Sequence, residues 1–196
     1  MSNTGIYGDH LPVMQEIMKQ IEERVGLLRA RLKEQYGMDP VEHCLGRIKS
    51  EESMREKCRR KGLPETTDSA ITKIRDAIGF RIVCSFINDV YVIRDDLKSM
   101  EGFETVAEKD YIRHVKPNGY RSYHLILREK RGYFVELQLR TISMDTWAAL
   151  EHQLKYKKTL SGNEELIIRE LKHCADTLAS TDISMQTIRD MIYGDQ

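Results

Sequence analysis

The fold is decided by residues 114–157, HVKPNGYRSYHLILREKRGYFVELQLRTISMDTWAALEHQLKYK. The Pro-Asn-Gly sequence at 117–119 predicts a turn, because proline fixes φ and both asparagine and glycine tolerate positive φ. Strand-forming residues then run over 122–128, and a loop containing glycine leads into a period-two alternation over 133–140. The stretch therefore predicts a turn, a strand, a short hairpin loop, a second strand and a helix.

The second of these strands carries unusual polar chemistry. Its apolar residues face one way, and Glu136, Gln138 and Arg140 follow one another on the opposite face, about 6.6 Å apart. The opposing hairpin strand brings the side chains of Tyr120 and His124 close to them. This face is either an ordinary solvated surface or a site in which a carboxylate handles a proton or metal and its neighbours bind anions.

The chain has 196 residues, which suits one domain with a sizeable core and helical extensions. Its formal charge is zero, so no overall field favours nucleic acid or a membrane, although 32% of the residues are charged. It has neither an apolar leader nor a run of about 20 apolar residues, so we expect a cytoplasmic protein with no membrane partner. The cysteines lack the spacing of a zinc site or disulfide frame and indicate free thiols of a reducing compartment: Cys44, Cys58, Cys84 and Cys174.

Apolar residues at steps of three and four predict a long helix at each end of the chain. The first begins at Leu11 and ends before Gly37 and Pro40, after an extended or disordered lead over residues 1–10. The second is opened by Asn163. Such a stripe packs either on its own domain or on another subunit. We expect the two helices to pack together and also to build a homo-oligomer.

A cluster of cations follows the first helix. Arg47 and Lys49 arrive from a turn, and Ser53, Lys57 and Arg60 then share one face of a helix because they are spaced by four and three. Four cations and a hydroxyl group that converge in this way could hold a polyphosphate. The alternative is a solvated basic helix that pairs with its own glutamates.

A predicted strand over 79–86 is bracketed by charge at its start. Asp76 precedes it and Arg81 lies within it, an arrangement that costs free energy unless both groups are used. Asp76 and Glu136 on a neighbouring strand could share Mg²⁺, an ion that prefers few protein ligands together with phosphate oxygens. The structural alternative is an ion pair of Asp76 with Arg81 or Arg75.

The remaining elements connect these motifs. Asn88 is expected to cap a helix that runs to Met100, and residues 103–109 predict another strand. The helix after the second hairpin strand should place one apolar face in the core, formed by Trp147, Leu150 and Leu154.

Five motifs follow one another between residues 41 and 158. They are RIKS at 47–50, DxxGxR at 76–81, KPNGYRSYH at 116–124, ExQLRT at 136–141 and WAxxEHxxxYK at 147–157. In this order and spacing they resemble the synthetase domain of the RelA/SpoT homologue family, above all its small single-domain members, the small alarmone synthetases. Such enzymes transfer the β,γ-pyrophosphoryl group of ATP to the 3′-hydroxyl group of GDP or GTP. The products are AMP and ppGpp or pppGpp.

The resemblance implies an α+β fold with a nucleotidyltransferase-like mixed sheet flanked by helices. Residues 1–40 would be an N-terminal helical extension, 41–160 the catalytic domain and 161–196 a C-terminal oligomerisation helix. Small family members form tetramers, so we expect a homotetramer that synthesises alarmone without hydrolysing it. In relatives that bind product or single-stranded RNA in the tetramer, an aromatic residue stands where this chain has His43. Product activation therefore stays open, and single-stranded RNA stays a candidate partner.

The resemblance also implies roles for single residues. Asp76 and Glu136 would be the catalytic pair and hold Mg²⁺, and Glu136 would accept the proton of the 3′-hydroxyl group as a general base. Arg47 and Arg81 would stack on opposite faces of adenine, which guanidinium planes can do. The ATP phosphates would be bound by Lys49, Ser53, Lys57 and Arg60.

On the side of the acceptor, GDP or GTP, Tyr120 would stack on guanine and Asp145 would accept its N1 and N2 hydrogens. Gln138, also on the acceptor side, would orient the site. Arg121 and Arg140 stay open between a site role and a structural salt bridge. The acceptor's 5′-phosphates would be bound by Lys109, Lys116 and His124.

Two other function classes remain for comparison. A nucleotidyl transferase that releases pyrophosphate usually needs a Gly-Ser turn followed by Asp-x-Asp, and the sequence has no such pattern. A catalytically inactive module that binds guanine nucleotide or single-stranded RNA would be favoured if Asp76, Glu136 or Tyr120 were absent, and all three are present.

Overall fold

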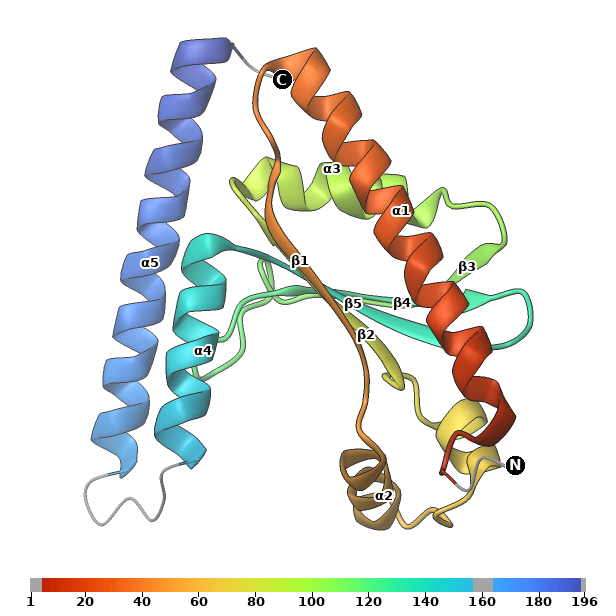
Figure 1. Ribbon diagram of the computed structural model, residues 1–196. Helices are drawn as coiled ribbons and strands as arrows, with labels where there is room; N and C mark the ends of the chain where they lie inside the picture. The colour runs from red at the N-terminus through yellow and green to blue at the C-terminus, as the bar shows by residue number, and fades with distance from the viewer. Residues whose placement is uncertain (1–4, 157–163, 195–196) are drawn as a thin grey trace.

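The computed structural model describes residues 5–156 and 164–194 (Figure 1). A mixed five-stranded sheet has the order β1-β2-β5-β4-β3, which confirms the expected α+β fold. Its strands are β1 Val41–Ile48, β2 Ile78–Cys84, β3 Phe103–Asp110, β4 Tyr123–Glu129 and β5 Phe134–Thr141. The helices of the described part are α1 Leu11–Tyr36, α2 Glu51–Arg60, α3 Ile87–Lys98, α4 Ile142–Tyr156 and α5 Glu164–Tyr193, with short helical turns at Gly8–His10 and Ser69–Lys73. None of these helices is long and apolar enough to cross a bilayer.

The strand register sets polar residues in rows across the sheet. β2 and β5 are parallel neighbours, and the other strand pairs are antiparallel. Glu136 of β5 lies beside Gly79 of β2. Gln138 lies between Arg81 of β2 and His124 of β4. Chain segments far apart in sequence thus bring their polar side chains to one surface of the sheet.

The opposite surface of the sheet is covered by α1 and α3 (Figure 1). α1 packs on β1 and α3, and α3 lies against the central strands. The apolar stripe of α1 is buried in this core through Met14, Ile17, Ile21, Val25, Leu28 and Leu32. The stripe therefore packs on its own domain, which was one of the two alternatives for it.

The predictions for the chain ends need correction. α5 packs on α4 and α3, so the expectation that it would pack along α1 is wrong (Figure 1). The predicted helix start at Asn163 lies outside the described residues. The disordered or extended lead is also wrong over the described residues 5–10, because Ile6 and Tyr7 are buried and Gly8–His10 form a helical turn.

Two local predictions are also wrong. Arg47 does not arrive from a turn; it lies on β1, an edge strand paired only with β2, where it faces Gly79. Asn88 does not cap α3. Instead, the carboxylate of Asp89 accepts a 3.1 Å hydrogen bond from the N–H of Phe86 at the start of that helix.

The face expected to bury three apolar residues of α4 is only partly in the core. Trp147 is buried, and its indole N–H donates a 2.8 Å hydrogen bond to the carbonyl oxygen of Leu171 on α5. Leu150 and Leu154 are 54% and 55% exposed. The part of α4 away from β5 runs beside α5 (Figure 1).

Candidate active site

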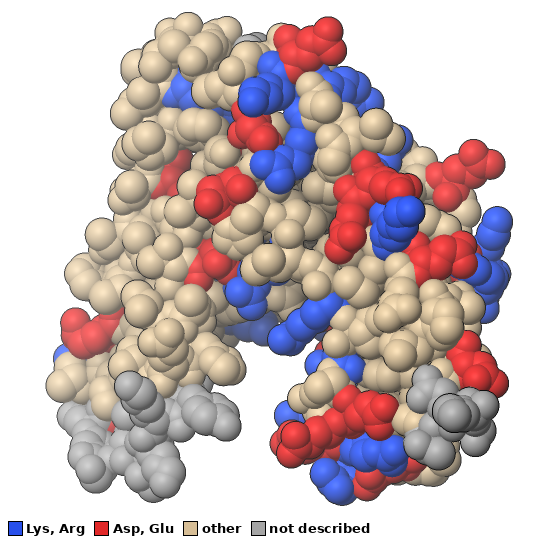
Figure 2. Space-filling view, in the orientation of Figure 1, with Lys and Arg blue, Asp and Glu red and all other residues tan. Residues whose placement is uncertain are grey.

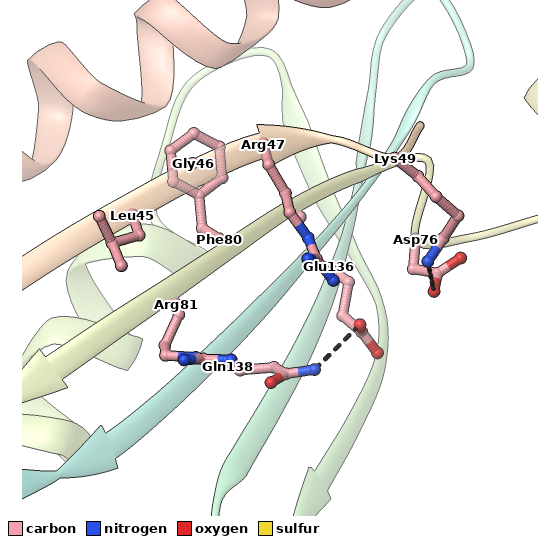
Figure 3. Close-up of a pocket in the computed structure, with 10 residues that line it drawn as sticks. Leu45, Gly46, Arg47, Lys49, Asp76, Phe80, Arg81, Glu136 and Gln138 are labelled. Carbon is pink, nitrogen blue, oxygen red and sulfur yellow. Dashed lines mark hydrogen bonds and ion pairs between the residues drawn. The ribbon is translucent and has the colours of Figure 1, made fainter. Parts of the chain in front are cut away.

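A cleft of about 620 Å³, including its open mouth, lies over β1, β2 and β5. Figure 2 shows the molecule hollowed between the side formed by α4 and α5 and the side formed by α2, with Lys and Arg side chains around the hollow. The polar side chains that line it were all predicted as site residues: Arg47, Lys49, Asp76, Arg81, Glu136 and Gln138 (Figure 3).

Asp76 lies at the end of this cleft, just before β2, and is paired with two lysines. Lys57 donates a hydrogen bond to its Oδ2 atom, and the Nζ atom of Lys49 lies 3.2 Å from the same oxygen. Burial raises the pKa of this carboxyl group, but the two lysines outweigh burial and hold the pKa below its ordinary value. These pairs replace the alternative ion pair with Arg81 or Arg75.

The donor set of the cleft fits a divalent cation bound together with phosphate. The Oδ1 atom of Asp76 is buried and has no hydrogen-bond partner among the described residues. Asp76 and Glu136 line the same cleft. The described residues hold no cluster of three metal-binding side chains. Two carboxylates alone suit Mg²⁺, which usually keeps water and phosphate oxygens as its other ligands.

Glu136 lies at the centre of the sheet surface. Gln138 donates a 3.2 Å hydrogen bond to its Oε2 atom (Figure 3). The Nδ1 atom of His124 lies 3.6 Å from its Oε1 atom. Burial raises the pKa of Glu136, but His124 and Gln138 favour the charged form, and the net pKa is below its ordinary value. Glu136 is therefore ionised at neutral pH and can accept a proton.

A second cleft adjoins the first over β3 and β4. It is lined by Lys109, Lys116, His124 and Glu136 together with Tyr111. Glu136 therefore borders both clefts. A group bound in either cleft can reach the same carboxylate.

Tyr120 belongs to an aromatic cluster beside this second cleft. Its hydroxyl group lies 2.8 Å from the Nε2 atom of His124. The ammonium group of Lys116 lies over the rings of both Tyr120 and Tyr111, at 4.7 and 4.4 Å from their centres. Tyr111 was missed by the sequence analysis, because it stands between motifs and in no periodic pattern. The ammonium group of Lys116 could leave the two rings and bind an anion in the cleft instead.

Arg140, which the sequence left open between a site role and a structural salt bridge, is buried and makes a salt bridge with Asp145. The Arg140 side chain is only 6% exposed and lies among residues that were predicted to bind the acceptor. It donates hydrogen bonds of 2.8 Å to the Tyr120 hydroxyl group, 2.9 Å to Gln138 and 3.2 Å to Asp145. Arg140 is thus a buried link between three predicted site residues. Arg121 instead makes a salt bridge of 2.8 Å with Asp176 of α5.

Asp145, at the start of α4, contacts two arginines. Its Oδ1 atom lies 3.2 Å from Arg140 of β5 and 3.5 Å from the Nε atom of Arg81 of β2. The carboxylate therefore links a residue that lines the first cleft, Arg81, to the buried Arg140.

Two predicted phosphate contacts do not reach either cleft. Ser53 is exposed on the first turn of α2, where its N–H bonds the side chain of the N-cap residue Ser50. Arg60 is exposed on the last turn of the same helix. Of the three residues expected on one face of α2, only Lys57 points to the site, where it binds Asp76.

Two adjoining clefts rich in cations, which share the carboxylate Glu136 and one of which also holds Asp76, are typical of a class: a nucleotide-binding transferase that brings together two phosphate-bearing substrates. The chain belongs to the RelA/SpoT family, since the model for the "Region found in RelA / SpoT proteins" matches residues 46–161. This confirms the resemblance that the five motifs indicated.

Among its relatives, the GTP pyrophosphokinase YwaC of Bacillus subtilis is 42% identical over 79% of this chain and 76% of its own length. The GTP pyrophosphokinase YjbM of the same organism is 35% identical over 76% of this chain and 72% of its own length. The crystal structure of small alarmone synthetase 2 from B. subtilis matches with a TM-score of 0.80 at 34% identity, covering 93% of this chain and 98% of that one. Small alarmone synthetase 1 bound to its product pppGpp matches with a TM-score of 0.77 at 29% identity, covering 91% and 94%.

Proposed function

We infer that the protein is a GTP pyrophosphokinase that makes the alarmone (p)ppGpp. It transfers the β,γ-pyrophosphoryl group of ATP to the 3′-hydroxyl group of GDP or GTP, which yields AMP and ppGpp or pppGpp. Two relatives named GTP pyrophosphokinase and a similar structure with bound pppGpp support this function. The observation that carries the inference is the place of Glu136, which borders both clefts.

ATP is proposed to bind in the cleft over β1, β2 and β5. Arg47 and Arg81 would stack on adenine. Lys49 and Lys57 already bind a carboxylate oxygen of Asp76, so a phosphate oxygen can take the place of that oxygen.

Mg²⁺ is the divalent ion proposed for this cleft, with the carboxylates of Asp76 and Glu136 as its protein ligands. When bound, it would neutralise charge on the transferred phosphates. Glu136 is ionised at neutral pH, because its pKa lies below the ordinary value. It is therefore proposed to accept the proton of the attacking 3′-hydroxyl group.

GDP or GTP is proposed to bind in the second cleft. Tyr120 would stack on guanine, and Asp145 would accept its N1 and N2 hydrogens. Arg140 supports both roles, because it bonds the Tyr120 hydroxyl group and the Asp145 carboxylate. Gln138 would keep the base Glu136 in place through their hydrogen bond. The 5′-phosphates would be bound by Lys109, Lys116 and His124.

The assembly proposed is a homotetramer built through α5. Residues 41–160 would form the catalytic domain, between the N-terminal extension and this helix. Large apolar side chains stand exposed along α5, among them Ile183, Met185, Ile188, Met191 and Ile192. Light scattering coupled to gel filtration tests the assembly, and a monomer at micromolar concentration would exclude it.

The reaction is tested by incubating the protein with ATP, Mg²⁺ and GDP and separating the nucleotides by chromatography. AMP together with a guanosine tetraphosphate is the expected result. Release of pyrophosphate would indicate a nucleotidyl transferase instead, and binding without turnover would indicate an inactive nucleotide-binding module.

A single substitution tests the role of the central carboxylate. Glu136→Gln keeps the size of the side chain and removes its basicity, so turnover should be lost while both nucleotides still bind. Glu104→Gln on β3 is the matched control, because the Glu104 side chain is 64% exposed and pairs only with the surface residue Arg128. Full activity in Glu136→Gln would remove that residue from its proposed role.

A further inference from the structure

The N-terminal segment reaches the donor side of the molecule. Ile6 and Tyr7 are 3% and 4% exposed and belong to the same core as the apolar stripe of α1. The Tyr7 hydroxyl group donates a 2.7 Å hydrogen bond to the carbonyl oxygen of Lys49, 42 residues further along the chain. This segment therefore contacts the chain directly where β1 leads into α2.

Lys49 is held through its backbone on both sides. Its N–H donates a 2.9 Å hydrogen bond to the carbonyl oxygen of Ala77, and its own carbonyl oxygen accepts from Tyr7. Its side chain extends into the cleft towards Asp76 (Figure 3). Because both backbone groups are bound, they fix the point from which the lysine side chain reaches the cleft.

The hydrogen bond from Tyr7 to the Lys49 carbonyl oxygen lies at the start of α2. Ser50, the residue after Lys49, caps this helix by accepting from the N–H of Ser53. The helix in turn carries Lys57, the second cation on Asp76. A displaced Lys49 backbone would therefore disturb both lysines of the cleft.

Tyr7 acts from outside the cleft. It is not among the residues that line it. Burial and the negative charges of Asp76 and Glu51 raise the pKa of the Tyr7 hydroxyl group above its ordinary value. The hydroxyl group therefore keeps its proton and stays a donor to the Lys49 carbonyl oxygen at neutral and mildly basic pH.

We propose that Tyr7 is a positioning residue for the donor nucleotide: its hydroxyl group fixes the backbone of Lys49 and thereby the lysine that binds a donor phosphate. This role rests on the proposed function, in which ATP occupies the cleft beside Lys49. It makes the N-terminal segment part of the machinery for donor affinity, in addition to its place in the core.

Tyr7→Phe tests the role, because it removes the hydroxyl group and keeps the buried ring. Tyr133→Phe is the matched control. The Tyr133 hydroxyl group lies 2.7 Å from the Nδ1 atom of His10, so it anchors the same segment without contacting Lys49. In Tyr7→Phe we expect the KM for ATP to rise about three- to tenfold, the equivalent of one hydrogen bond, while the KM for GDP stays unchanged. The control should change neither.

Two outcomes would overturn the proposal. An equal rise of the ATP KM in both variants would mean that docking of the segment matters and the Lys49 bond does not. A rise of both KM values in Tyr7→Phe would show a general loss of structure, which thermal unfolding of the same samples also measures.

A binding experiment separates this proposal from the proposed function. The affinity for a non-hydrolysable ATP analogue is measured by calorimetry in the wild-type protein and both variants. Weaker binding in Tyr7→Phe alone supports the positioning role, and unchanged binding refutes it. Failure of the wild-type protein to form a guanosine tetraphosphate would refute the function, whatever the calorimetry gives.

Discussion

Gly119→Ala would press the loop before β4 against α5. Gly119 has a φ of +91°, in the region that favours glycine. A Cβ atom added there would lie 2.7 Å from the Cβ atom of Ala175 and 3.2 Å from the Cα atom of Lys172. The same loop is tied to α5 by the salt bridge of Arg121 with Asp176. Neither the loop nor the helix can move away without breaking that contact.

The magnitude follows from two separable costs. A left-handed backbone costs an alanine about 1–2 kcal/mol. Overpacking against a helix backbone adds about 1–3 kcal/mol, so Gly119→Ala should lose about 2–5 kcal/mol of unfolding free energy. Gly132→Ala is the matched control, because Gly132 has a φ of +97° but a Cβ atom there would meet nothing within 4 Å. Gly132→Ala should therefore lose only the unfolding free energy that the left-handed backbone costs, about 1–2 kcal/mol.

Thermal unfolding followed by circular dichroism measures the difference. For a chain of this size about 2–4 °C of Tm is lost per kcal/mol, so Gly119→Ala should fall by roughly 4–20 °C and Gly132→Ala by roughly 2–8 °C. Gly119→Ala should also raise the KM for GDP, because Tyr120 follows it in the loop, and leave the KM for ATP unchanged. Equal losses of Tm in the two variants would refute the close packing of loop and helix.

Two further substitutions test the donor side. Gly46→Ala on β1 would place a Cβ atom 2.5 Å from the ring of Phe80. It should lower the unfolding free energy, measured in urea, by about 1–3 kcal/mol and raise the KM for ATP. Unchanged values would mean that the ring moves freely. Lys57→Met removes one of the cations that lower the pKa of Asp76. The stabilisation from a carboxyl group with a lowered pKa is present above its unfolded pKa and lost as pH falls through its folded pKa. Acid unfolding of Lys57→Met should therefore begin at higher pH than in the wild-type protein, and Lys61→Met, at the exposed end of α2, should leave it unchanged.

The hairpin and the terminal helices were predictable because their periodicity is local. The alternation that leads into β5 and the apolar stripe of α1 each repeat often enough to define a buried face. β1 was missed for a physical reason. It is an edge strand, and its residue Arg47 lines the cleft. Gly46 stands where an apolar side chain would be expected, because the ring of Phe80 fills that space. Nothing in its own sequence shows that the space is filled from another strand.

The site, like the fold, could be predicted from the sequence only in part. The sequence named the polar residues that line the first cleft but not Tyr111 in the second, and it did not show which side chains hold one another. Arg140 could be placed only when the fold brought Tyr120 and Asp145 within its reach. Tyr7 gave no signal at all, since two apolar residues before a helix define no period and its partner Lys49 lies 42 residues away.

The pairing of Asp76 has a consequence for how the donor and a metal ion would bind. Lys49 and Lys57 cannot keep their contacts with Asp76 and bind phosphate oxygens through the same donors. If phosphate takes both lysines, the Asp76 carboxylate, whose side chain is only 17% exposed, is left without a compensating cation. A buried charge that loses its partner is strongly destabilising. A divalent ion bound together with the nucleotide would restore the balance, and the Oδ1 atom of Asp76, which has no hydrogen-bond partner among the described residues, would be its ligand. On this argument the donor and the metal bind as one unit, so omission of Mg²⁺ should weaken binding of an ATP analogue itself, and equal affinity with and without Mg²⁺ would contradict it.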